Sequence, residues 1–196
     1  MGASVSRKAV WFWWTFLVWL ILDQATKIWV YTNLAYRTDE IKVIPGFLSI
    51  VHAQNPGAAF GILVDYEHRH WVFLAFTVVA VFVIVDMYRK VPEHDRLLGF
   101  ALGLILSGAV GNAIDRVHKQ TVTDFIRVYT DNPSLKPKLV EWFGTYEWPS
   151  FNVADSALLI GVVLFMAHSM FVDEGEEAEG TPSAGQIGRA SCRERV

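Results

Sequence analysis

Two aspartates in the second half of the chain lie in surroundings suited to acid–base chemistry. Asp124 lies in T-V-T-D-F-I, and Asp155 lies in F-N-V-A-D-S, where it begins a long apolar stretch. A carboxylate beside hydrocarbon is costly unless it is paired, hydrated or neutralised. Two such groups brought together can share one proton, an arrangement that supports hydrolysis by an activated water. The alternative is structural, with Asn152 as a helix cap and Asp155 stabilising the first turn.

Apolar blocks determine the predicted fold class. The chain has 196 residues, of which 53% are hydrophobic, and its mean hydropathy is +0.30. A spanning helix needs about 20 mostly apolar residues. The apolar blocks are Val10–Leu22 with Ile28–Tyr31, Trp71–Val85, Leu97–Ile114 and Ser156–Val172. Tryptophans at the block ends favour a membrane protein over a soluble helical bundle. We therefore predict an all-α membrane protein with four transmembrane helices and a small β element.

Basic residues predict the orientation of these helices. Arg7 and Lys8 precede the first block, and Arg89, Lys90 and Arg96 lie in the short loop between the second and third. The loops on the other side carry more basic residues but are several times longer. By density, both termini are predicted to be cytoplasmic. The first block lacks a small-x-small cleavage site, so we expect it to remain as an anchor.

Polar motifs then fall at one face of the membrane. Because the helices alternate in direction, each motif is predicted at the extracytoplasmic end of its helix or in an extracytoplasmic loop. The motifs are D-Q-A-T-K (23–27), Q-N-P-G-A-A-F-G (54–61), G-N-A-I-D-R (111–116), Asp124 and F-N-V-A-D-S (151–156). Convergence of ionisable groups at one membrane face indicates a functional site.

Each supporting residue also has a structural interpretation. Asp23 and Lys27 are four residues apart and would neutralise each other on one helix face, unless Lys27 binds a lipid phosphate. Asn55 either caps a turn or binds the substrate backbone. Asp115 and Arg116 are expected to form a salt bridge that closes their helix.

The loops predict a small extracytoplasmic β element that rests on the membrane surface. I-K-V-I-P-G-F-L-S-I-V-H predicts two short strands around Pro45-Gly46, and V-T-D-F-I-R-V-Y predicts a third. The alternative is two irregular loops. We place the membrane domain at residues 1–172 and a disordered acidic tail at 173–196. The last residues, 188–196, change composition abruptly and are predicted to be non-native.

Several chemistries lack support in the sequence. Cys192 is the one cysteine, so no internal disulfide is possible. His68 and His70 lack partners at metal-ligand spacing, and we predict no metal and no cofactor. There is no G-x-S-x-G or H-E-x-x-H motif, and no basic stripe for nucleic acid. A proton relay or transporter and a non-catalytic lipid-binding scaffold are the competing functions.

Taken together and in this order, D-Q-A-T-K, N-P-G-A-A-F-G, G-A-V-G-N-A-I-D-R, V-T-D-F and F-N-V-A-D-S resemble lipoprotein signal peptidase (signal peptidase II). The resemblance covers the chain to about Val172. It implies a bacterial inner-membrane aspartic endopeptidase, sensitive to globomycin. Such enzymes cleave a prolipoprotein just before its diacylglyceryl-modified cysteine, and membrane lipids are further partners.

The resemblance also implies roles for individual residues. The catalytic pair falls on Asp124 and Asp155. The substrate-binding or supporting residues are Asp23, Lys27, Asn55, Gly57, Asn112, Asp115, Arg116, Asn152 and Ala154. This chain departs from the family pattern at Pro56, where a small polar residue is usual. It also departs in the segment between the two aspartates, which is longer than usual, so the resemblance does not predict the shape of this outer loop.

Overall fold

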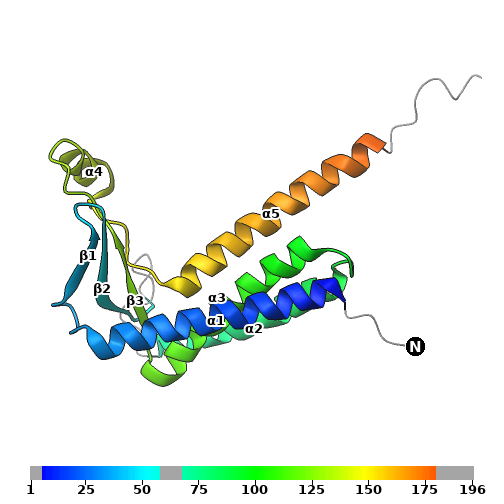
Figure 1. Cartoon of the computed structure of the whole chain (residues 1–196), viewed down its shortest axis with the longest axis horizontal. Helices are drawn as coiled ribbons and strands as arrows, with labels where there is room; N and C mark the ends of the chain where they lie inside the picture. Colours follow the sequence, from blue (N-terminus) through cyan, green and yellow to red (C-terminus); the bar gives the residue numbers. More distant parts are fainter. Residues whose placement is uncertain (1–5, 58–67, 180–196) are drawn as a thin grey trace, which may run out of the picture.

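Long helices lie side by side with a small sheet at one end of them (Figure 1). The computed structural model describes residues 6–57 and 68–179. Its helices are α1 (Arg7–Asn33), α2 (Arg69–Lys90), α3 (Arg96–Lys119), α4 (Lys136–Phe143) and α5 (Val153–Glu179). Its strands are β1 (Glu40–Ile44), β2 (Leu48–Asn55) and β3 (Val122–Val128). The mostly helical class and the small β element are confirmed.

Three helices of the described part are long and apolar enough to cross a membrane: α2, α3 and residues Val153–Met170 of α5. Helix α1 is longer than α2, but it is not among them. Its tryptophans and the polar D-Q-A-T-K motif lower its hydropathy, although Trp14 and Ile21 project outward. The prediction of four spans is therefore supported for three helices, and a spanning α1 stays a prediction.

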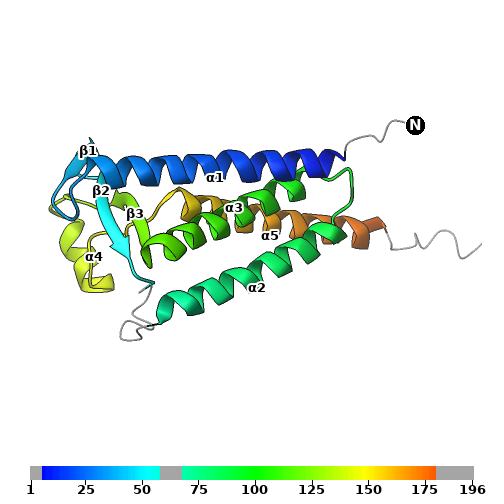
Figure 2. The ribbon, with the colours of Figure 1, turned by 90° about the horizontal axis from the view of Figure 1, so that it is seen from below.

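Helix α3 is the centre of the helical bundle, because its glycines allow close backbone approach. A Cβ on Gly103 would lie 2.6 Å from the carbonyl oxygen of Phe12 in α1. On α5, a Cβ on Gly161 would lie 2.8 Å from the carbonyl oxygen of Ala101 in α3. Helices α1 and α5 thus pack against α3, as Figure 2 shows from a second side.

Replacing Gly161 with alanine should destabilise the fold. The added Cβ would also lie 2.7 Å from Cγ1 of Ile105, and the facing backbone of α3 cannot yield easily. Overpacking costs about 1–3 kcal/mol, and a contact with backbone belongs to the upper part of that range, above the ~1 kcal/mol that alanine gains in helix propensity. We expect a lower free energy of unfolding in detergent, whereas Val163→Ala, at an exposed position of α5, should change it by less than ~0.5 kcal/mol. Equal stability of the two variants would contradict the tight α3–α5 contact.

The sheet is antiparallel with strand order β1-β2-β3. As predicted, β1 and β2 form a hairpin around Pro45-Gly46, where Gly46 takes the left-handed conformation (φ 78°) that glycine tolerates. β3 pairs with β2, which places Ala53 opposite Asp124. The third predicted strand is therefore confirmed, and it carries one of the two aspartates.

Helix α4 was not predicted from the sequence. Its segment begins with the polar stretch D-N-P-S-L-K-P-K, a composition typical of a loop, but Pro137 lies in the first turn of α4, where a missing N–H costs nothing. Gly144 then ends the helix in a left-handed conformation. At the end of the chain, α5 continues beyond Val172 to Glu179, because glutamate and alanine favour helix. The predicted boundary at 172 stays a prediction, and residues 180–196 lie outside the described residues.

Candidate active site

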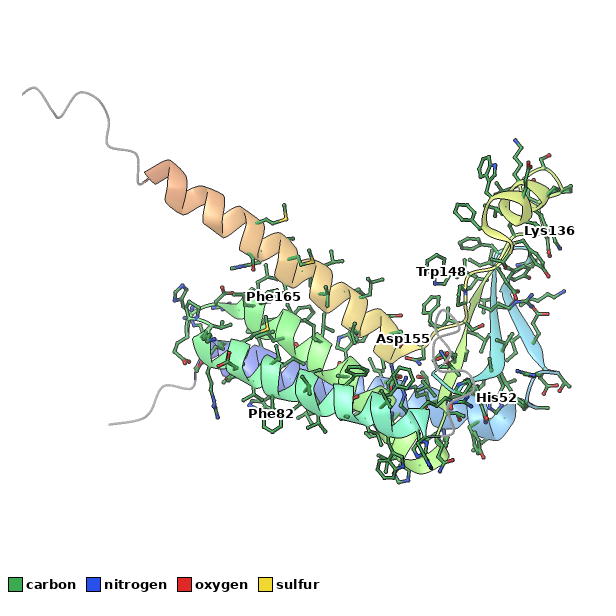
Figure 3. All side chains as sticks on the ribbon, turned by 180° about the vertical axis from the view of Figure 1, so that it is seen from behind. His52, Phe82, Lys136, Trp148, Asp155 and Phe165 are labelled. Carbon is green, nitrogen blue, oxygen red and sulfur yellow. The ribbon has the colours of Figure 1, made fainter. Side chains whose placement is uncertain are left out.

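The first turn of α5 positions Asp155 through a reciprocal cap. Asn152 precedes the helix, and its Oδ1 accepts the backbone N–H of Asp155 at 2.9 Å. Oδ2 of Asp155 accepts the backbone N–H of Asn152 at 3.2 Å. This arrangement satisfies two donors that a helix start would otherwise leave without partners. The structural role predicted for both residues is present, and these two hydrogen bonds orient Asp155. Figure 3 shows Asp155 at the start of α5.

The side-chain amide of Asn152 connects this cap to Asp124. Its Nδ2 donates to Oδ1 of Asp124 at 2.7 Å. Asp124 lies in β3 and is only 3% exposed, whereas Asp155 is half-buried. One asparagine therefore contacts both carboxyl groups. Backbone hydrogen bonds between β3 and Phe151, just before α5, bring the two aspartates together.

Asn112 of α3 bridges the pair to a buried lysine. Its Nδ2 donates to Oδ1 of Asp155 at 2.7 Å. Its Oδ1 accepts from Nζ of Lys27 at 2.9 Å and from Nδ2 of Asn152 at 3.2 Å. The amide is thereby held in one orientation, with its donor side toward Asp155.

Lys27 lies between two carboxylates and is only 1% exposed. Its Nζ lies 3.0 Å from Oδ2 of Asp23 and 3.6 Å from Oδ2 of Asp115. The ion pair of Asp23 and Lys27 is confirmed, and its burial excludes the alternative in which Lys27 binds a lipid phosphate. Asp23 also accepts the backbone N–H of Ala154 at 2.9 Å, which ties α1 to the first turn of α5.

The expected salt bridge between Asp115 and Arg116 is wrong. Asp115 pairs with Lys27 and Lys119, and its Oδ2 accepts the backbone N–H of Thr123 at 2.9 Å. Neighbouring residues on a helix point in different directions, so a side chain cannot easily pair with the next one. The guanidinium of Arg116 instead lies over the ring of Phe73, 4.9 Å from its centroid.

Asn55 and Gly57 form the turn that leaves β2. Oδ1 of Asn55 accepts the N–H of Gly57 at 2.9 Å, as its predicted turn-capping role requires. Gly57 has φ 95°, a conformation that favours glycine. The Asn55 side chain also hydrogen-bonds to Asp124. The rest of this motif, residues 58–61, lies outside the described residues.

The surroundings of Asp124 favour its protonated form. Burial raises the pKa of Asp124 to about 7, and the nearby charge of Asp155 adds to the rise. Hydrogen bonds from Asn152 and Asn55 and the charge of Lys27 oppose it. Near neutral pH the site can therefore hold one proton between two carboxyl groups, as acid–base hydrolysis requires.

A cavity of ≈ 270 Å³ lies beside this site, between α2, α3 and α5. Asn112, Arg116 and Thr77 supply its polar lining, and Phe73, Phe76 and Leu158 are apolar. The sequence motifs did not indicate the phenylalanines, because α2 carries none of the polar motifs. Gln24, which donates to Asp23 at 2.9 Å, was also missed as a separate contributor, although it lies within D-Q-A-T-K. Within the described residues, no group of histidine, cysteine, aspartate or glutamate is placed to hold a metal.

Comparison with known proteins gives a consistent result. Residues 15–171 match the family model Peptidase_A8, described as signal peptidase (SPase) II. The chain is 42% identical over 160 residues to the lipoprotein signal peptidase of Geobacter metallireducens, covering 82% of this chain and 90% of that protein. It is 39% identical to that of Geobacillus kaustophilus, covering 82% and 93%. A solved bacterial membrane enzyme at 30% identity superposes with a TM-score of 0.67 over 87% of this chain and 91% of that one.

Proposed function

This chain belongs to the signal peptidase II family of peptidases, which remove signal peptides from prolipoproteins, and we propose that Asp124 and Asp155 are its catalytic pair. The observation that supports this proposal is the shared contact with Asn152. Its side-chain amide donates to Asp124, and its backbone N–H donates to Asp155. The two carboxyl groups are thereby held together beside a cavity large enough to admit part of a substrate.

The proposed reaction uses one proton held by the pair. Because burial favours the protonated form of Asp124, Asp155 is left as the base that takes a proton from water. The water oxygen attacks the scissile carbonyl, and the proton of Asp124 stabilises the developing oxyanion. The C–N bond then breaks, and the leaving amine takes a proton from the pair. Asn112 and Asn152 keep the carboxyl groups oriented, and the ion pairs of Lys27 keep Asn112 in place.

The membrane arrangement is part of the same proposal. Helix α1 is the fourth span, since Trp14, Ile21 and Ile28 present an apolar outer surface. Both termini are then cytoplasmic, and the site lies at the extracytoplasmic face of the bacterial inner membrane. The substrate is a prolipoprotein whose diacylglyceryl cysteine enters between α2, α3 and α5, so that its peptide bond lies at the pair. Globomycin is expected to compete for this site, and nucleic acid is not expected to bind.

The pH dependence of cleavage tests the assignment of the proton. As pH rises through about 7, Asp124 loses its proton and both carboxyl groups become charged, so kcat should fall about tenfold per pH unit above that point. The measurement is the rate of cleavage of a diacylglyceryl-modified prolipoprotein by the purified protein in detergent, between pH 5 and 9. Circular dichroism at each pH controls for unfolding. A kcat that stays constant from pH 6 to 9 would contradict a proton held by Asp124.

A further inference from the structure

Large aromatic side chains are exposed on α4 and on the segment that follows it. Trp142, Phe143 and Trp148 are 67%, 71% and 69% exposed. We call these three residues the aromatic patch. Under the patch is an open cavity of ≈ 460 Å³ with an almost wholly apolar lining. An exposed apolar surface of this kind marks an interaction site.

The periodicity of α4 directs these residues to one side. Leu135, Leu139 and Phe143 follow at intervals of four and line the cavity. Trp142 is adjacent to this stripe at i+3 from Leu139, whereas Glu141 falls on the opposite face of the helix. Trp148 lies across the cavity, on the segment that leads toward α5. The helix thus presents a polar face outward and leaves its apolar face open.

The position of α4 in the molecule indicates what covers this face. Figures 1 and 2 both show α4 at the sheet end of the bundle, and in Figure 1 the strands run across the direction of the long helices. Since α2, α3 and α5 have the length and composition of membrane spans, the sheet extends along the membrane surface. Figure 3 shows Trp148 on the side of the sheet that faces α5, which is the side nearer the bilayer.

We propose that α4 and residues 145–149 lie in the headgroup region of the membrane, with the aromatic patch inserted among the lipids. Tryptophan suits this region, since its ring is apolar and its N–H remains near water. Lys138 is exposed beside the patch and can face anionic phosphates, whereas Lys136 lies over the ring of Tyr146 and pairs with Asp131. The acidic Glu141 faces away. A lipid acyl chain fits the cavity better than water, because an apolar cavity holds water poorly.

Contact between α4 and the lipids would determine the height of strand β3 above the bilayer. Val128 and Tyr129 line the cavity, and Asp124 lies in the same strand, β3, as Val128. Anchoring α4 therefore fixes one end of the strand that carries Asp124. The inference rests on the membrane location of the chain and not on the proposed roles of the aspartates.

Spin labels at neighbouring positions of α4 test the inference. In a background with Cys192→Ser, a nitroxide is attached to Trp142→Cys or to the matched control Glu141→Cys. The full-length protein is reconstituted in vesicles of phosphatidylethanolamine and phosphatidylglycerol. We expect the label at 142 to collide with oxygen more than with a water-soluble nickel chelate, at a depth of ~5–10 Å below the phosphates. The label at 141 should show the reverse preference. If Trp142→Cys does not fold, Phe143→Cys provides the same measurement.

Other occupants give different results, and each would overturn the inference. Equal nickel access at 141 and 142 would mean that the patch faces water. Low access of both reagents at 142 would mean that protein covers it. Dipolar broadening that disappears on dilution with unlabelled protein would identify that cover as a second copy of the chain.

Discussion

Asparagine in place of Asp124 should reduce cleavage of a diacylglyceryl-modified prolipoprotein by ~10³-fold or more, since the variant cannot hold or transfer the catalytic proton. The same substitution should make the folded protein more stable above pH 7. Oδ1 of asparagine can still accept from Nδ2 of Asn152, so the contact at 2.7 Å is retained. A residue with a purely structural role would not combine these two effects.

The sign of the stability effect follows from proton binding. The pKa of Asp124 is raised from 3.8 to about 7 on folding, so the folded state binds more protons than the unfolded state between these values. Stability therefore falls as pH rises from about 4 to 7 and stays low above 7. The shift corresponds to a cost on the order of 4 kcal/mol, which Asp124→Asn removes. Unfolding in detergent at pH 5 and pH 8, for both proteins, measures this difference.

Asp155→Asn should also abolish cleavage, but with the opposite effect on stability. Its Oδ2 accepts the backbone N–H of Asn152, and its charge lies at the positive end of α5. Losing that charge should cost about 1 kcal/mol. Asp131→Asn, an exposed aspartate beyond the end of β3, is the matched control and should keep full activity. Cleavage near the wild-type rate by either variant of the pair would refute the proposed mechanism.

The convergence of the polar motifs could be predicted from the sequence because it depends on helix direction alone. Helices that alternate in direction bring Asp23, Asn112 and Asp155 to the same end of the bundle, and hydrogen bonds connect them there through Lys27 and Ala154. The hairpin of β1 and β2 could also be predicted from the sequence, since Pro45-Gly46 interrupts a run of β-branched residues. These features are determined by local pattern and connectivity.

The partners of Asp115 and the existence of α4 could not be predicted in the same way. Asp115 pairs with Lys27 of α1 and with the backbone of Thr123, contacts that depend on how helices pack. Sequence proximity favoured Arg116, which the helical geometry turns toward Phe73. Helix α4 is short and amphipathic, and a proline in so short a segment is as typical of a loop as of the first turn of a helix.

Lys27→Met should destabilise the protein strongly, by about 3–5 kcal/mol, because it leaves the buried carboxylate of Asp23 without its counter-charge and leaves Asp115 with Lys119 alone. Both side chains are almost fully buried, and Lys27 lies within 3.6 Å of each. Lys119→Met is the matched control. It removes another partner of Asp115, at 3.3 Å, but from a side chain that is 24% exposed, so the loss should stay below ~1 kcal/mol. Thermal unfolding in detergent compares the two variants.

A second substitution distinguishes lost charge from lost packing. In Asp23→Asn with Lys27→Met, the carboxylate charge that Lys27→Met leaves unpaired is gone, while asparagine Oδ1 can still accept the N–H of Ala154. We expect the double variant to be more stable than Lys27→Met alone. Its kcat should nevertheless stay low, because Asn112 has lost the donor at 2.9 Å that orients its amide toward Asp155. If the double variant were no more stable than the single one, the lysine would act by filling space, and the charge network would not be what holds Asn112 in place.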